Sequence, residues 1–196
     1  METAYMNKKI VFIGNSIVNG YPFDRSKCFV TLVGQMTGCG VVNKGNNGET
    51  TSNILSRFER DVLSADPDAV FILTGTNDFI YGEASPQQAF DNLMRMARMA
   101  ENHTPAIKPV FLTPLPVDEA MASEKWLVGE NINYRYVNDC LKAITELIKA
   151  SGYEYIDLNA GYGACGQYHD GVHPTEDGYR FIADLISKNM GKIFSI

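Results

Sequence analysis

Residues 9–17 read KIVFIGNSI, and this stretch contains both a predicted strand and the residues that follow it. The strand is the run Lys9–Ile13, which is continuously apolar after its first residue. Such runs are typical of parallel strands that are covered on both faces. Gly14, Asn15 and Ser16 follow directly, and ligands of open parallel sheets bind outside the carboxyl ends of the strands. Ser16 is therefore a candidate functional residue, although a serine at this point could equally cap the next helix.

Four more short runs are rich in apolar and β-branched residues, and each is followed by Gly, Asn, Thr or Pro. They are Val41–Asn43, Ala69–Leu73, Pro109–Leu112 and Tyr155–Leu158. Between the five runs, apolar residues recur at helical spacing, which predicts helices around residues 29–36, 54–62, 90–97, 136–148 and 179–186. The alternation predicts an α/β fold, a three-layer α/β/α sandwich around a five-stranded parallel sheet.

The length of the chain is typical of one domain, and we expect a single domain over residues 1–196. Residues 114–131 contain the only tryptophan, Trp126, and show no clear periodicity. They predict a long loop after the fourth strand, and loops of this length in compact domains are often functional.

The charge of the chain argues against two classes of partner. The net charge is −6, the pI is about 5.1, and no Lys/Arg run occurs. We therefore expect no nucleic acid and no anionic membrane surface as partners. The polar start, Met1–Lys9, lacks the apolar segment of a signal peptide, and the longest apolar run is too short to span a bilayer. A cytoplasmic protein without membrane insertion is expected, and no pattern in the sequence indicates its oligomeric state.

Two further strand ends carry polar residues suited to chemistry. The second strand leads into a glycine-rich turn, residues 43–50, whose backbone N–H groups could face an anion. The alternative for this turn is a flexible connection capped by a threonine. The third strand leads into Gly75–Asp78, where Asn77 could point its amide into the same cleft or form a local turn.

The last strand is followed by His169, Asp170 and His173, in a chain with only three histidines. An aspartate three residues before a histidine in a tight turn can reach the imidazole and fix its tautomer, and Pro174 favours an extended backbone at His173. The alternative is a pair of structural loop histidines. Together, the strand ends supply a serine, an amide-rich turn, an asparagine and an Asp–His pair, which are the parts of an acyl-transfer site.

These residues resemble the four sequence blocks of the SGNH hydrolase superfamily, also called the GDSL-type lipases, esterases and acylhydrolases. The matching blocks are Phe12–Ile17, Asn43–Gly48, Gly75–Asp78 and Asp170–Pro174, in the order of the family. The resemblance implies a flavodoxin-like SGNH hydrolase fold. It also implies hydrolysis of a carboxylic ester with no metal and no cofactor.

The resemblance further implies a role for each motif residue. Ser16 is the expected nucleophile, His173 the general base, and Asp170 the residue that orients the imidazole. The expected oxyanion hole consists of the backbone N–H groups of Ser16 and Gly48 and the side-chain amide of Asn77.

The chain departs from the family at Asn15, where an aspartate is usual. We expect Asn15, Trp126 and His169 as possible residues of the substrate pocket. The expected partner is a small acyl ester, with a short-chain or acetyl ester favoured. Lipids, thioesters and acetylated sugars are all substrates within the family, and no residue here decides between them.

Two other functions compete with the esterase hypothesis. A metal-dependent hydrolase or phosphoesterase could use the cluster His169-Asp170-His173 with Asp78 or Glu49. A non-catalytic, flavodoxin-like module could bind a small ligand in the cleft at the strand ends.

Overall fold

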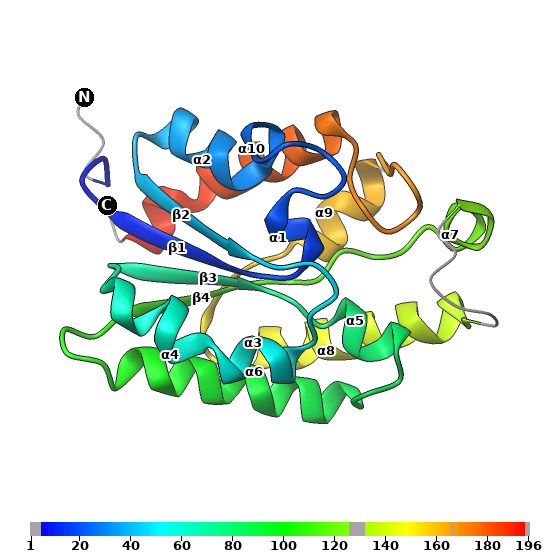
Figure 1. Cartoon of the computed structure of the whole chain (residues 1–196), viewed down its shortest axis with the longest axis horizontal. Helices are drawn as coiled ribbons and strands as arrows, with labels where there is room; N and C mark the ends of the chain where they lie inside the picture. The colour runs from blue at the N-terminus through cyan, green and yellow to red at the C-terminus, as the bar shows by residue number, and fades with distance from the viewer. Residues whose placement is uncertain (1–4, 126–131, 166, 195–196) are drawn as a thin grey trace.

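The computed structural model describes residues 5–125, 132–165 and 167–194 (Figure 1). In these ranges, five strands form one sheet in the order β2-β1-β3-β4-β5, and all four pairings are parallel. The strands are β1 Lys9–Gly14, β2 Gly40–Gly45, β3 Ala69–Leu73, β4 Lys108–Leu112 and β5 Glu154–Ile156. The predicted five-stranded parallel sheet is confirmed.

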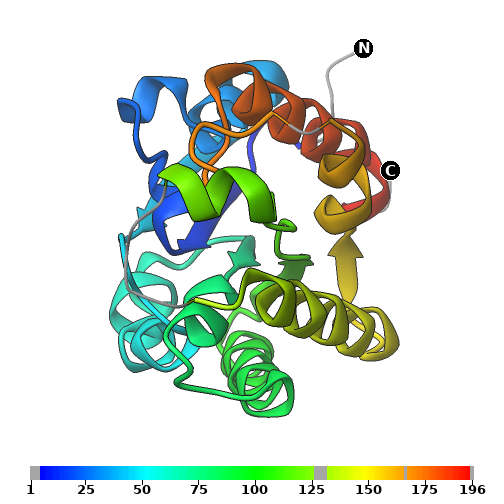
Figure 2. The same ribbon diagram turned by 90° about the vertical axis from the view of Figure 1, so that its right-hand side faces the viewer.

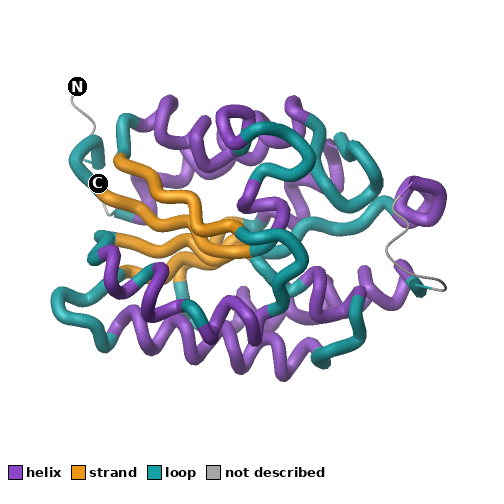
Figure 3. The backbone as a smooth tube through the Cα atoms, viewed as in Figure 1, coloured by secondary structure: helices purple, strands orange, loops and turns teal. Residues whose placement is uncertain are grey.

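Helices cover both faces of the sheet, as predicted (Figure 3). One layer contains α1 Ser16–Asn19, α2 Phe29–Thr37, α9 Leu158–Cys165 and α10 Glu176–Ile193 (Figure 1). The other layer contains α3 Thr51–Ser56, α4 Phe58–Asp61, α5 Thr76–Ile80, α6 Pro86–Glu101 and α8 Tyr134–Ala150. Two short 3₁₀ helices span Arg25–Lys27 and Leu63–Ala65. Helix α7 Glu119–Lys125 lies at the carboxyl end of the sheet, which faces the viewer in Figure 2.

The sheet separates two apolar cores, and β1 contributes to both. Ile10 and Phe12 pack with α2 and α10, whereas Val11 and Ile13 pack with the helices of the opposite layer. Successive side chains of a strand point to opposite faces, so a strand buried on both sides must be apolar at every position. This explains why the run that follows Lys9 does not alternate.

The strand order creates a switch point between β1 and β3. The chain leaves β1 toward β2 on one side, and β3 then pairs with β1 on the other side. Gly14 at the end of β1 lies between Gly45 and Leu73 in the register. A crevice is expected where crossovers diverge in this way, outside the carboxyl ends of the strands.

The structure corrects three sequence predictions. The predicted helix around 54–62 is divided into α3 and α4 at Arg57, whose guanidinium binds backbone carbonyls at the strand ends. The predicted loop 114–131 contains α7, which begins where the side chain of Asp118 accepts the N–H of Met121 at 3.0 Å. The predicted fifth strand ends at Ile156, because the chain then turns into α9.

Among the residues that the structure describes, no helix is both long and apolar enough to cross a bilayer. The single-domain organisation over residues 1–196 and the cytoplasmic location stay predictions.

Candidate active site

The turn after β1 raises Ser16 at the edge of the sheet. Gly14 is required there, because a Cβ at this position would collide with the carbonyl oxygen of Leu73 and with the side chain of Val18. Asn15 caps α1, and its side-chain oxygen accepts the N–H of Ile17 at 3.4 Å. Since Asn15 provides the cap, the hydroxyl of Ser16 is available for another partner. Ser16 opens the helix, where backbone N–H groups have no intrahelical acceptor.

The turn after α9 holds Asp170 and His173 against each other. One carboxylate oxygen of Asp170 accepts the backbone N–H groups of Val172 at 3.0 Å and His173 at 2.8 Å. The other oxygen lies 2.7 Å from Nδ1 of His173. Burial alone would raise the pKa of Asp170, but hydrogen bonds from the ring and backbone of His173 outweigh it and lower the pKa below its ordinary value. Asp170 is therefore an ionised acceptor that fixes the imidazole.

Nε2 of His173 lies 2.8 Å from the hydroxyl oxygen of Ser16. Ser16, His173 and Asp170 thus form one continuous chain of hydrogen bonds, in which Ser16 is far from the other two residues in the sequence. The ring of Tyr21 contacts the imidazole edge-on, with ring centroids 4.7 Å apart. All three members of the chain are buried, with exposed fractions of 8%, 3% and 7%.

The glycine-rich turn and Asn77 approach the same point from β2 and β3. Gly48 has a φ of 77°, a left-handed conformation that glycine adopts at low cost. The side-chain amide of Asn77, in the first turn of α5, donates one N–H to the carbonyl of Glu49 at 2.9 Å. An asparagine amide has a second N–H, which stays available for a ligand.

The residue after Asn77 holds the two turns together. The buried carboxylate of Asp78 accepts the backbone N–H of Thr51 at 2.9 Å and its hydroxyl at 2.5 Å. Burial raises the pKa of Asp78, and the bonds from Thr51 oppose that rise. Asp78 is therefore a structural tie between α3 and α5 rather than a free ligand.

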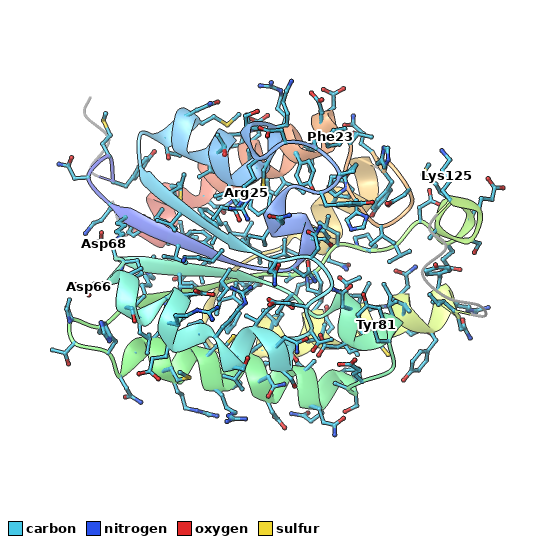
Figure 4. All side chains as sticks on the ribbon, in the orientation of Figure 1. Phe23, Arg25, Asp66, Asp68, Tyr81 and Lys125 are labelled. Carbon is cyan, nitrogen blue, oxygen red and sulfur yellow. The ribbon has the colours of Figure 1, made fainter. Side chains whose placement is uncertain are left out.

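The turns after β1, β2, β3 and α9 surround one open cavity of about 130 Å³. Ser16, Gly48, Asn77 and His173 all line it, together with Asn47, Tyr21 and Tyr81. Tyr81 and Phe23 lie toward the carboxyl ends of the strands, whereas Asp66 and Asp68 lie at the opposite end of the sheet (Figure 4). The structure thus brings together every residue that the sequence predicted for the triad and the oxyanion hole.

Comparison with known proteins places the chain in a family. A family model described as the GDSL-like lipase/acylhydrolase family matches residues 12–181. The chain belongs to this family. The match extends from β1 into α10 and so includes every block of the site.

One curated protein and several solved structures are similar to this GDSL family protein. The uncharacterized lipoprotein YqeF of Bacillus subtilis is 36% identical over 84 residues, which cover 40% of this chain and 34% of YqeF. The match thus spans about a third of that relative's length. The solved structure of a lipase/acylhydrolase from Enterococcus faecalis is 26% identical, with a TM-score of 0.76, and the alignment covers 94% of this chain and 96% of that chain.

A catalytic mutant of the acetylxylan esterase Axe2 from Geobacillus stearothermophilus has a TM-score of 0.73 at 19% identity. The alignment covers 97% of each chain, and at this identity the likeness is one of fold.

The three residues predicted for the substrate pocket have other positions. Asn15 is only 2% exposed and acts as the helix cap, so it does not line the cavity. His169 is exposed and packs its ring against Phe23, with centroids 5.8 Å apart, outside the cavity lining. Trp126 lies outside the described residues.

Tyr21, Asn47 and Tyr81 also line the cavity and were not predicted from the sequence. Asn47 immediately precedes Gly48, and Tyr81 lies one helical turn beyond Asn77, so adjacency to the motifs was the available signal. Tyr21 carries no such signal, because its contact with His173 joins distant parts of the chain.

The geometry does not support the alternative of a metal centre at His169, Asp170 and His173. The ring of His169 packs on Phe23, and both ring nitrogens of His173 already face Asp170 and Ser16. Across the described parts of the chain, no group of three His, Cys, Asp or Glu residues is arranged to hold a metal ion.

Proposed function

We propose that this chain is a serine esterase that cleaves a short-chain carboxylic ester through Ser16, His173 and Asp170. The observation that carries the proposal is the hydrogen-bond chain from Ser16 to Asp170, with distances of 2.8 and 2.7 Å, at the wall of a cavity that Gly48 and Asn77 also line. A non-catalytic ligand-binding module requires no such chain.

In this proposal, His173 accepts the hydroxyl proton of Ser16 as the oxygen attacks the ester carbonyl carbon. The tetrahedral intermediate then collapses, and His173 returns the proton to the departing alcohol. Water attacks the resulting acyl-enzyme by the same route, which releases the acid and restores the hydroxyl. Asp170 holds Nδ1–H throughout and stabilises the imidazolium, as its lowered pKa allows.

The negative oxygen of the intermediate would receive three hydrogen bonds. The proposed donors are the backbone N–H groups of Ser16 and Gly48 and the second N–H of the Asn77 amide. These groups are held before the substrate arrives, so they need no reorganisation during the reaction. No step requires a cofactor, and the partner is the small acyl ester itself.

The size of the cavity favours a short acyl group. Pockets for drug-sized ligands measure roughly 300–1,000 Å³, whereas this cavity measures about 130 Å³. We propose an acetyl or similarly short acyl group inside the cavity. The alcohol part of the ester would then lie toward Tyr21 and Tyr81, each 41% exposed.

The proposal is tested by the hydrolysis of p-nitrophenyl esters from acetate to long chains. Wild type, Ser16→Ala and the surface control Ser187→Ala are assayed together, with and without a chelator. We expect chelator-independent activity, highest for acetate, that disappears only in Ser16→Ala. Activity that survives Ser16→Ala would refute the serine mechanism, and activity lost with the chelator would favour a metal site. If all three proteins are inactive on these esters, acetylated sugars are the next substrates.

A further inference from the structure

A buried arginine, Arg57, binds the ends of the two strands that lead to Ser16 and Gly48, and it does not line the cavity. Arg57 stands between α3 and α4 with only 9% of its side chain exposed. Its Nη2 donates to the carbonyl of Gly14 at 3.1 Å and to the carbonyl of Lys44 at 2.9 Å. Gly14 ends β1 two residues before Ser16, and Lys44 lies at the end of β2, four residues before Gly48. One guanidinium therefore joins the ends of β1 and β2.

Glu49 extends this connection to the third strand end. Its carboxylate accepts Nε of Arg57 at 2.7 Å and the side-chain amide of Asn46 at 2.7 Å. Its backbone carbonyl accepts the amide of Asn77 at 2.9 Å. The N–H of Asn46 also donates to the carbonyl of Gly14 at 3.1 Å.

Asp61 holds the arginine from the other side. Its carboxylate accepts Nη1 of Arg57 at 2.8 Å, and it also binds Arg60 at 3.0 Å and Lys44 at 3.6 Å. Every nitrogen of the Arg57 guanidinium is thus engaged, and the planar group can take only one orientation. Such charge-assisted bonds are shorter and stronger than neutral ones, so the carbonyls of Gly14 and Lys44 are held at fixed positions.

We infer that Arg57, together with Glu49, is a positioning residue that sets the relative places of Ser16, Gly48 and Asn77. The inference rests on the proposed ester hydrolysis, because it assigns the oxyanion donors a common support. Arg57 does not line the cavity and so does not touch the substrate. Its loss should leave ground-state binding almost unchanged and weaken the contacts that form in the transition state, which lowers kcat with little change in KM.

The test compares Arg57→Gln, Arg57→Lys and the matched control Arg60→Gln. Arg60 shares Asp61 with Arg57, but its side chain is 74% exposed. We expect Arg57→Gln to lower kcat on p-nitrophenyl acetate about 10²-fold, the cost of a displacement near 1 Å at a reacting centre. Arg57→Lys keeps the charge with fewer donors and should rescue part of the loss. Arg60→Gln should keep wild-type kcat, and KM should stay within about threefold in all three variants.

Amide hydrogen exchange gives a readout that does not depend on activity. We expect faster exchange at Asn46, whose N–H donates to the carbonyl of Gly14, in Arg57→Gln and unchanged exchange in Arg60→Gln. A folded Arg57→Gln protein with wild-type kcat would overturn the inference, as would an equal loss in Arg60→Gln. If Arg57→Gln does not fold, Glu49→Gln takes its place, and wild-type kcat in that variant would overturn the inference too. If Ser16→Ala keeps full activity, the proposed function fails separately, and the exchange data alone decide whether Arg57 holds the loops.

Discussion

Asp170→Asn separates a catalytic role of the Asp–His pair from a structural one. One oxygen of Asp170 accepts the N–H groups of Val172 and His173, while the other faces Nδ1 of the imidazole at 2.7 Å. In the variant, the two backbone donors retain the amide oxygen, so the amide NH₂ must face Nδ1. Nδ1 then becomes an acceptor and the ring proton moves to Nε2. An imidazole protonated at Nε2 cannot take the proton of Ser16.

The size of the effect follows from this tautomer. The same substitution in a serine protease triad lowers kcat by about 10⁴, which corresponds to roughly 5 kcal/mol of transition-state stabilisation. The fold should lose much less, because both backbone bonds survive and one charge-assisted bond is worth roughly 1.5–3 kcal/mol. Catalysis should therefore nearly disappear in a protein that is still folded.

The assay measures initial rates on p-nitrophenyl acetate together with denaturant unfolding of the same samples. Asp177→Asn is the control, since Asp177 is an exposed acid in the first turn of α10. A folded Asp170→Asn protein that keeps more than about a tenth of wild-type kcat would refute the reasoning, because a wrong tautomer permits no such rate.

Three further changes test other parts of the site. Asn77→Ala should lower kcat about 10²–10³-fold and keep a native circular dichroism spectrum, because one oxyanion donor is lost. The exposed control Asn102→Ala should keep the wild-type rate. A wild-type rate in Asn77→Ala would contradict the oxyanion assignment. Asp61→Asn should be less stable than wild type at neutral pH, since hydrogen bonds from neighbouring arginines hold the pKa of Asp61 far below its ordinary value. That stabilisation is present above the ordinary Asp pKa of about 3.9 and is lost as the pH falls toward the lowered pKa of the folded state. Urea unfolding should therefore show that the difference in free energy of unfolding between wild type and Asp61→Asn becomes smaller in acid. A difference that does not change with pH would contradict this assignment of the lowered pKa. Tyr81→Ala should change the relative rates on acetate esters that differ in the alcohol, because Tyr81 lines the cavity on the side proposed for the alcohol part. Unchanged relative rates, or the same change in the exposed control Tyr136→Ala, would show that Tyr81 does not contact the alcohol part.

The sheet could be predicted because its strands are buried on both faces. A continuously apolar run such as 69–73 permits few other interpretations once helical periodicity lies on either side of it. The ends of helices and strands were less predictable where contacts with distant parts of the chain determine them. Residues 119–125 form α7 next to Gly171, whose carbonyl accepts the N–H of Asp118 at 2.8 Å. No local pattern in residues 114–131 encodes a contact with a turn so far along the chain.

The residues of the candidate site could be predicted to lie together for a different reason. Asp170 and His173 are separated by three positions, and their pairing depends on a local turn that the sequence itself displays. Ser16 and Asn77 follow predicted strands directly, so parallel topology places them at one edge of the sheet. The 2.8 Å contact between Ser16 and His173 is not local, and only the folded chain shows it.

The role of Arg57 could not be predicted from the sequence because of the groups that it binds. Two of its partners are the backbone carbonyls of Gly14 and Lys44, and any residue at those positions would supply the same oxygen. The residue types at positions 14 and 44 therefore do not indicate the interaction. A triad, in contrast, requires particular side chains at each of its positions. Its ionic partner Asp61, four residues away, has the spacing of an ordinary surface pair on one helix. A buried arginine that holds main-chain atoms in place thus resembles, in sequence alone, a solvated charge on a helix, and its role becomes visible only when the strand ends are brought together.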